Sequence, residues 1–235
     1  MIQLPLAGSA KTITINPNKI IAVGLNYREH VKESLTFDKN NQSIPTEPVL
    51  FAKTKNVLIG PGEAIVIPAH IKDYNFDDPR VDPECELAII IGKKGRHISE
   101  DKAFDYVLGY TCFNDVSQRN IQRSDPSGWF RGKSFDTFGP IGPVVVSHAD
   151  IGDPQSLNVT CKINGVLKQK GNTSEMIFTI PVLIAYISRQ FTLEEGDIIA
   201  TGTPAGISPI ISGDIVEVEV ERIGILKNPV TEEKI

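Results

Sequence analysis

Residues 82–92 read DPECELAIIIG, and this stretch decides how the chain folds. Its apolar run from Leu87 to Ile91, closed by a glycine, is typical of a strand that is buried on both faces. Similar short runs recur between glycine and proline turns; they include IIAVG (20–24), PVLFAKT (48–54), GPIGPVVV (139–146) and DIVEVEVERIGIL (214–226). Two more, LNVTCKING and VLKQKG, are joined by Asn164-Gly165, which favours a tight hairpin.

Helical patterns are fewer than strand patterns. We expect four helices, over residues 26–35, 99–109, 115–124 and 179–191. Asn26 and Ser99 would be the N-caps of the first two. Many short strands with few helices predict a mostly β fold of the α+β class, with helices packed outside the sheet. Residues 1–18 would form an N-terminal strand segment and residues 226–235 a C-terminal tail.

The composition is that of an ordinary globular protein. Of the 235 residues, 40% are hydrophobic and 23% are charged, and the formal net charge is −5. Without a basic run, nucleic acid and anionic membranes are poor partners. We see no signal peptide and no apolar stretch long enough to span a bilayer. The three scattered cysteines contain no C-x-x-C pair, so we expect reduced thiols and a cytoplasmic location.

Glu84 and Glu86 are two residues apart on the expected strand, so their side chains share a face. Two carboxylates at the mouth of a buried strand repel each other unless a cation lies between them. A hard divalent cation such as Mg²⁺ suits oxygen ligands. The alternative is a strand end that emerges into solvent with two ordinary surface glutamates.

Two further segments carry polar residues at regular spacing. In GYTCFNDVSQRNIQ (109–122), Asp115 is either a third metal ligand or the N-cap of the polar helix that follows. Arg119 and Gln122 would share the helical face of Asp115. Arg119 either binds a substrate carboxylate or forms an internal salt bridge. In WFRGKSFDTFGPIGP (129–143), Lys133 either binds an anionic substrate or is a solvated loop lysine.

A loop and a helix complete the candidate set. In ATGTPAGI (200–207), backbone N–H groups near Gly202 and Thr203 could approach a ligand oxygen closely, or the loop is only a tight turn. In GLNYREHVKES (24–34), His30 and Glu33 lie one helical turn apart. They are either a solvated surface pair or a general base with its orienting carboxylate.

Taken together, these segments resemble the fumarylacetoacetate hydrolase family in its short single-domain form. The matching landmarks appear in the family's order: GLNYREH, PVLFAKT, ECELAIIIGK, GYTCFNDVSQRNIQ, RGKSFDTFGPIGP, INGVLKQKGNTSEMIF and LEEGDIIATGTPAGI. The resemblance implies a rolled mixed β-sheet with helices outside, a catalytic domain over residues 19–225, and a homodimer. It also implies that residues 26–46 form a lid helix and loop.

The resemblance assigns roles residue by residue. Glu84, Glu86 and Asp115 match the family's Mg²⁺ ligands, with Mn²⁺ or Ca²⁺ as alternative metals. Lys133 matches the active-site lysine. Arg119, Gln122, Gly202 and Thr203 match groups of the substrate site. His30 and Glu33 match a catalytic dyad in which Glu33 orients His30 and His30 activates water.

The same resemblance implies a 2-oxo acid substrate and an enolate stabilised by the metal and Lys133. Three reactions share that enolate. We rank hydrolysis of a C–C bond in acylpyruvates or fumarylpyruvate first, because the dyad favours water activation. Oxaloacetate decarboxylation and isomerisation of 2-hydroxyhepta-2,4-diene-1,7-dioate are the alternatives. An inactive relative that binds a dicarboxylate is the alternative from outside the enzymes.

Overall fold

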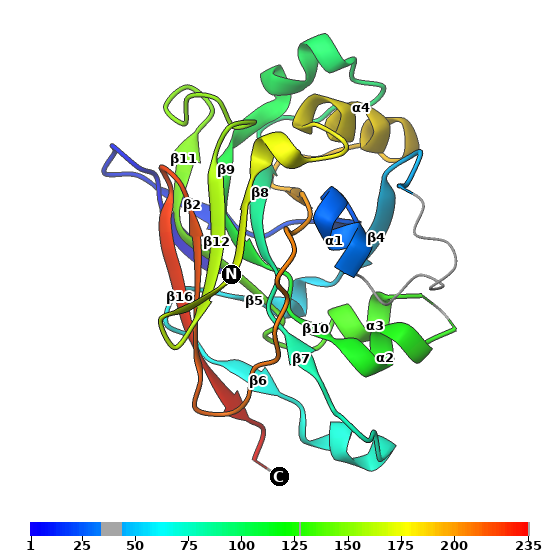
Figure 1. Cartoon of the computed structure of the whole chain (residues 1–235). Coiled ribbons are helices and arrows are strands. Elements are labelled where there is room, and N and C mark those ends of the chain that lie inside the picture. Colours follow the sequence, from blue (N-terminus) through cyan, green and yellow to red (C-terminus); the bar gives the residue numbers. More distant parts are fainter. Residues whose placement is uncertain (34–43, 127, 235) are drawn as a thin grey trace.

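Two β-sheets face each other in the computed structural model, which describes residues 1–33, 44–126 and 128–234 (Figure 1). The seven-stranded sheet has the order β4 (Val49–Lys53), β3 (Ile20–Gly24), β14 (Ile198–Ala200), β8 (Cys85–Ile91), β9 (Val107–Asn114), β11 (Gly139–Ser147) and β5 (Leu58–Ile59). The five-stranded sheet has the order β13 (Val166–Asn172), β12 (Asn158–Ile163), β15 (Ile215–Val220), β16 (Gly224–Glu232) and β6 (Ile65–Ile67). Two ribbons pair β1 (Ile2–Pro5) with β2 (Thr12–Ile15) and β7 (Val81–Asp82) with β10 (Ser117–Gln118).

Strand β8 lies at the centre of the larger sheet. It pairs antiparallel with β14 on one side and β9 on the other, and all of its residues are buried. Leu87, Ile89 and Ile91 point into the main core, whereas Ala88 and Ile90 point into a second, smaller core. The strand predicted from its uninterrupted apolar run is therefore confirmed, because both of its faces contact a core.

Helices lie outside the sheets, as the sequence predicts. They are α1 (Arg28–Glu33), α2 (Arg119–Ser124), α3 (Phe130–Lys133) and α4 (Ile180–Gln190). Helix α4 packs beside the 3-10 helix Glu100–Tyr106, and α2 packs against α3 at a different edge of the molecule (Figure 1). No helix in the described residues is both long enough and apolar enough to cross a bilayer. The mostly β fold with outer helices is confirmed.

Four local expectations were wrong. Residues 226–232 are not a tail but most of β16, which pairs with β15 and β6. Residues 214–226 are not one strand, since a turn at 221–223 separates β15 from β16. The helix expected over 99–109 is a 3-10 helix that ends at Tyr106, and Ser99 does not cap it through its side chain. Asn26 is buried, and its amide bonds Phe178 and the Thr201 carbonyl rather than the start of α1.

The central strand provides a stability test. Ile89→Ala in β8 should lower the free energy of unfolding by about 2–5 kcal/mol, because it removes a fully buried side chain and leaves a cavity. Ile225→Ala in β16 is the matched control, since Ile225 is 47% exposed; it should change stability by less than about 0.5 kcal/mol. Urea denaturation of both variants gives the comparison. Equal losses would mean that β8 is not the centre of the core.

Candidate active site

The three candidate metal ligands lie together where β8 begins and β9 ends. Cys85 pairs with Asn114 in the sheet, and the N–H of Asp115 donates to the carbonyl of Glu84 at 2.9 Å. Carboxylate oxygens of Glu84, Glu86 and Asp115 all lie within 4.8 Å of one another, and the three side chains are buried. The surface-glutamate alternative is therefore wrong, because a strand end inside the protein exposes neither residue.

Asp115 is not a helix cap either. Gln118 caps α2, since its side-chain oxygen accepts the N–H of Ile121 at 2.7 Å. The two oxygens of Asp115 instead accept from two lysines. Lys53 Nζ donates to Oδ1 at 2.6 Å, and Lys133 Nζ donates to Oδ2 at 2.7 Å. Each Asp115 oxygen has a second lone pair, and Asp115 could bind a metal ion through one that the lysines do not use.

Lys133 is not a solvated loop lysine. It ends the short helix α3, is 2% exposed, and also donates to Glu84 Oε2 at 2.6 Å. Burial alone would lower its pKa, but the carboxylates of Asp115 and Glu84 outweigh burial and raise the pKa of Lys133. The lysine therefore stays protonated, with its charge directed at two of the carboxylates.

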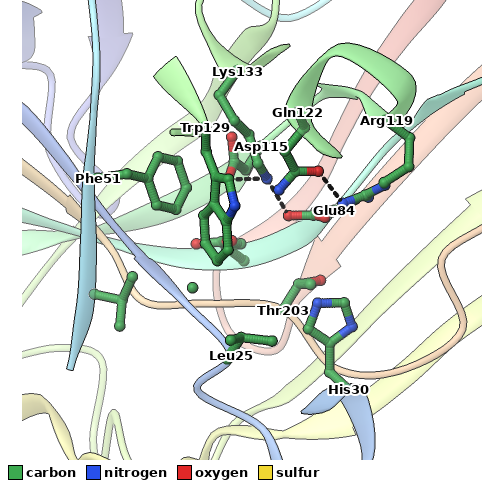
Figure 2. Close-up of a pocket in the computed structure, with 13 residues that line it drawn as sticks. Leu25, His30, Phe51, Glu84, Asp115, Arg119, Gln122, Trp129, Lys133 and Thr203 are labelled. Atoms are coloured by element: carbon green, nitrogen blue, oxygen red, sulfur yellow. Dashed lines mark hydrogen bonds and ion pairs between the residues drawn. The ribbon is translucent and has the colours of Figure 1, made fainter. Parts of the chain in front are cut away.

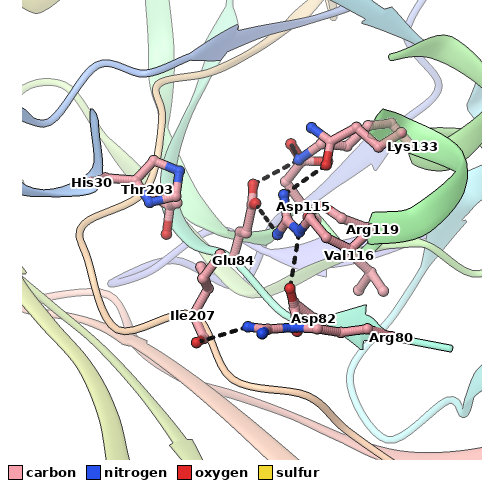
Figure 3. A network of polar contacts seen from close by, with 12 residues as sticks. His30, Arg80, Asp82, Glu84, Asp115, Val116, Arg119, Lys133, Thr203 and Ile207 are labelled. Atoms are coloured by element: carbon pink, nitrogen blue, oxygen red, sulfur yellow. Dashed lines mark hydrogen bonds and ion pairs between the residues drawn. The ribbon is translucent and has the colours of Figure 1, made fainter. Parts of the chain in front are cut away.

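Arg119 forms internal ion pairs, as the second of its two sequence interpretations predicted (Figure 3). Its guanidinium donates to Asp82 Oδ2 at 2.9 Å, to Glu84 Oε1 at 2.6 Å and to Gln122 Oε1 at 2.6 Å. Burial opposes ionisation of Glu84, yet the charges of Lys133 and Arg119 hold the pKa of Glu84 far below its usual value. Each of the three nitrogens of the Arg119 guanidinium thus donates to a protein side chain.

Glu86 differs from the other two carboxylates. Among the described residues, the N–H of Gly202 donates to Glu86 Oε2 at 2.8 Å, and no lysine or arginine forms an ion pair with Glu86. Burial, then Asp115 and Glu84, raise the pKa of Glu86 well above its usual value. A buried carboxylate without a counter-cation, beside two others, is the donor set that a divalent metal ion suits. The residues present therefore fit the metal.

The His30–Glu33 pair lies on the other side of the same pocket. His30 is 6% exposed, and its Nδ1 lies 3.3 Å from Glu33 Oε2. The N–H of Gly206 donates to both Glu33 oxygens at 3.0 Å. Burial opposes ionisation of Glu33, but the His30 and Gly206 bonds lower the pKa of Glu33. The solvated-pair alternative is wrong. The lid loop expected after this helix lies mostly outside the described residues, since 34–43 are not described.

The pocket has a carboxylate wall, a facing wall that carries His30, and an apolar wall of Leu25, Phe51 and Trp129 (Figure 2). Its lining comprises Val23, Gly24, Leu25, His30, Phe51, Glu84, Glu86, Asp115, Arg119, Gln122, Trp129, Lys133 and Thr203. Phe51 and Trp129 meet edge to face, with ring centroids 5.3 Å apart. Gly24 must be a glycine, because a Cβ there would lie 2.2 Å from the Trp129 ring. Thr203 lines the pocket while its hydroxyl bonds the Cys85 carbonyl at 2.9 Å.

Two charged residues of this site were missed in the sequence. Asp82 is fully buried between Arg119 and Arg80, and Lys53 is buried against Asp115. Asp82 could have been found, because it continues the alternation of Glu84 and Glu86 by two residues. Lys53 carried no such signal, since a lysine at the end of an expected strand normally faces solvent.

Comparisons with known proteins agree with this geometry. A family model described as fumarylacetoacetate (FAA) hydrolase C-terminal matches residues 19–231. A mitochondrial oxaloacetate tautomerase of Xenopus laevis is 41% identical over 223 residues, covering 92% of this chain and 66% of that protein. The chain therefore belongs to the fumarylacetoacetate hydrolase family.

Two solved structures are also similar. The 2-hydroxyhepta-2,4-diene-1,7-dioate isomerase of Mycobacterium marinum superimposes with a TM-score of 0.80 at 39% identity, covering 94% of this chain and 77% of that one. The maleylpyruvate hydrolase of Sphingobium sp. SYK-6, solved with manganese(II) and pyruvate, gives 0.76 at 35% identity, covering 93% and 72%. The relatives named here are enzymes with different reactions, so family membership leaves the reaction open.

Glu86, the carboxylate of the cluster without an ion pair, predicts how folding stability depends on pH and on metal. Without metal, in the presence of a chelator, the pKa of Glu86 is higher in the folded protein than in the unfolded chain, where it is about 4.3. The contribution of Glu86 to folding stability is therefore complete below about pH 4.3 and is lost as the pH rises through the pKa of the folded state. Glu86→Gln should remove this loss. Mn²⁺ at about 100 times its Kd should stabilise the wild-type protein by about 2.7 kcal/mol and leave the variant unchanged. Thermal melts across pH, with and without Mn²⁺, measure both effects.

Glu63→Gln is the control for that experiment, because Glu63 also accepts a backbone N–H, from Gly60, but is exposed. It should keep the response of the wild type to both pH and Mn²⁺. A Mn²⁺-dependent shift that persists in Glu86→Gln would remove Glu86 from the ligand set.

Proposed function

We propose that the protein is a divalent-metal-dependent hydrolase that cleaves a C–C bond in 2,4-dioxo acids of the acylpyruvate type. The observation that carries this proposal is one pocket lined by three buried carboxylates, Lys133 and His30, with Glu33 behind His30 at 3.3 Å from its Nδ1. An anion-stabilising wall and a candidate base on the facing wall are the two parts that hydrolysis of a β-dicarbonyl bond requires.

Glu84, Glu86 and Asp115 would bind the metal, with Mg²⁺ as the expected ion and Mn²⁺ the ion present in the similar hydrolase. When bound, the metal supplies a Lewis acid and a template for the oxygens of a 2-oxo acid. Lys133 would place its ammonium charge near the oxygen on which negative charge develops. On this wall, the protein itself thus supplies the positive charge of the buried Lys133 ammonium group.

On the facing wall, the contact between His30 Nδ1 and Glu33 favours the tautomer with the proton on Nδ1. Nε2 is then free to accept a proton from water, and Glu33 stabilises the imidazolium that forms. The hydroxide would add to the carbonyl carbon of the acyl group, and the C–C bond to the neighbouring CH₂ would break, with its electron pair passing into the enolate. The proton on His30 would then return to that carbon, so that pyruvate leaves as the ketone together with a carboxylic acid. Gly206 stabilises this arrangement because its N–H bonds both oxygens of Glu33.

The apolar wall supports an acyl substituent rather than a second carboxylate. Leu25, Phe51 and Trp129 would lie beside the part of the substrate that is remote from the carboxylates. Of the pocket's described lysine and arginine side chains, Lys133 and Arg119 already face protein carboxylates. A neutral acyl group fits such a wall better than a charged one.

Oxaloacetate tautomerisation is the second candidate. The 41% identity to the Xenopus laevis tautomerase favours it. This reaction moves a proton between carbon and oxygen and needs no water attack, so His30 would act as acid and base without cleaving a bond. Decarboxylation of oxaloacetate and isomerisation of the heptadiene-dioate remain alternatives on the same residues.

A substrate panel tests the proposal. Purified protein with Mg²⁺ or Mn²⁺ should release pyruvate from acetylpyruvate faster than it tautomerises or decarboxylates oxaloacetate, and a chelator should abolish the activity. His30→Gln should lower kcat by about 10²–10⁴-fold, the usual contribution of a general base. The exposed His70→Gln is its control. Oxaloacetate tautomerisation without pyruvate release from acetylpyruvate would replace hydrolysis by the second candidate.

The loop that contacts Glu33 predicts a second effect. Gly206 has φ of +104°, and a Cβ there would lie 2.1 Å from the Lys168 carbonyl. Gly206→Ala should therefore displace the N–H from Glu33 and lower kcat roughly 10- to 100-fold, the equivalent of one hydrogen bond to a charged group. Gly213→Ala is the matched control, since φ is +97° but no atom lies within 4 Å. Equal kcat values for the two variants would show that Gly206 does not support the dyad.

A further inference from the structure

We infer that Lys53 is a positioning residue that orients Asp115 as a metal ligand. The inference rests on the proposed metal site and adds a residue that lies behind the pocket wall. Lys53 Nζ is 2.6 Å from Asp115 Oδ1, and its side chain is completely buried. The ammonium also lies 3.4 Å from the carbonyl of Val116, the residue after the ligand.

The two lysines that contact Asp115 have different surroundings. Lys133 lines the pocket and donates to two carboxylates, Glu84 and Asp115. Lys53 does not line that pocket, and the one carboxylate that it bonds in the described structure is Asp115. A metal ion that enters the pocket would compete with Lys133 for Asp115 Oδ2 while Lys53 continues to bind Oδ1. Lys53 would thereby leave Oδ2 as the Asp115 oxygen available to a metal ion.

The backbone that carries Lys53 is well suited to this role. Lys53 is the last residue of β4 and pairs with Ile20 of β3. Phe51 lies two residues earlier on the same face of β4, where its ring is 5.1 Å from Lys133 Nζ. One strand therefore positions contacts to both lysine-bound oxygens of Asp115, directly at Oδ1 and through Lys133 at Oδ2. Ligands that are oriented by a fixed neighbour bind metal more tightly than free ones.

A charge-neutralising role and a positioning role for Lys53 predict opposite changes in metal affinity when the lysine is replaced. If Lys53 only neutralises charge, its removal leaves the cluster more negative and strengthens binding of a divalent cation. If Lys53 positions Asp115, its removal frees the carboxylate to rotate and weakens that binding. The sign of the change in metal affinity therefore separates the two roles.

The test is Mn²⁺ binding to the metal-free protein, measured by isothermal titration calorimetry, with melting temperatures recorded in parallel. We expect Lys53→Met and Lys53→Gln to weaken Mn²⁺ binding by about 10- to 100-fold. Lys53→Arg keeps a charged donor and should recover part of the affinity. Lys19→Met is the matched control, because Lys19 pairs with the buried Asp197 at 2.7 Å, and Lys19 begins the segment that leads into β3. It should lower stability and leave Mn²⁺ affinity unchanged.

Unchanged or tighter Mn²⁺ binding in the folded Lys53→Met and Lys53→Gln variants would overturn the inference and make Lys53 a charge neutraliser. Should Lys53→Met fail to fold, Lys53→Gln, which also lacks the ammonium group, provides the same comparison against the wild type and Lys53→Arg. Because binding is read without turnover, absence of Mn²⁺ binding by the wild-type protein would instead reject the proposed metal site. The two failures are thus distinguishable.

Discussion

Around the candidate metal site, the described residues include more buried carboxylates than buried cations to pair with them. Asp82, Glu84, Glu86 and Asp115 are at most 4% exposed, whereas the buried cations beside them are Lys53, Lys133 and Arg119. A buried charge is tolerated only when it is paired and hydrogen-bonded. Three of these acids meet that condition within the described structure, and Glu86 meets it only with a backbone N–H. A divalent cation would neutralise this excess negative charge. The surrounding elements of the fold hold the buried carboxylates in place.

The fold maintains that charge by bringing distant segments to one point. The acids come from the mouth of the central strand and its neighbour, while the cations come from the edge strand β4 and the helices α2 and α3. The end of β14 supplies the remaining group, since Gly202 donates to Glu86 with φ of +95°. A Cβ at this position would approach Asn26 Cβ to 2.8 Å, so the close approach depends on glycine. Strand β4, helices α2 and α3 and the loop after β14 each contribute at least one bond to these carboxylates.

The sequence was most informative where local periodicity coincides with the tertiary structure. The run from Leu87 to Ile91 and the Asn164-Gly165 hairpin are both strand signals with a physical cause within a few residues, and both are confirmed. The tail assigned to 226–235 was wrong because β16 pairs with β15 across the turn at 221–223 and with β6, a strand from a distant part of the chain. Lys53 was missed because its partner is 62 residues away and nothing in PVLFAKT indicates a buried cation. The resemblance brought together His30, Lys133 and the three acids, which the motifs alone left ambiguous.

The carboxylate wall of the pocket and the wall that carries His30 differ in how they are held together. The carboxylate wall is built from paired strands and buried ion pairs and, under the proposed function, would stabilise negative charge on a 2-oxo acid. The facing wall is formed by the short helix α1 and by the loop after β14, joined through the bonds from Gly206 to Glu33. A few hydrogen bonds orient His30 there, in contrast to the multiple ion pairs opposite. Under the proposed function, the choice between attack by water and transfer of a proton therefore depends on how firmly Glu33 and Gly206 orient one imidazole.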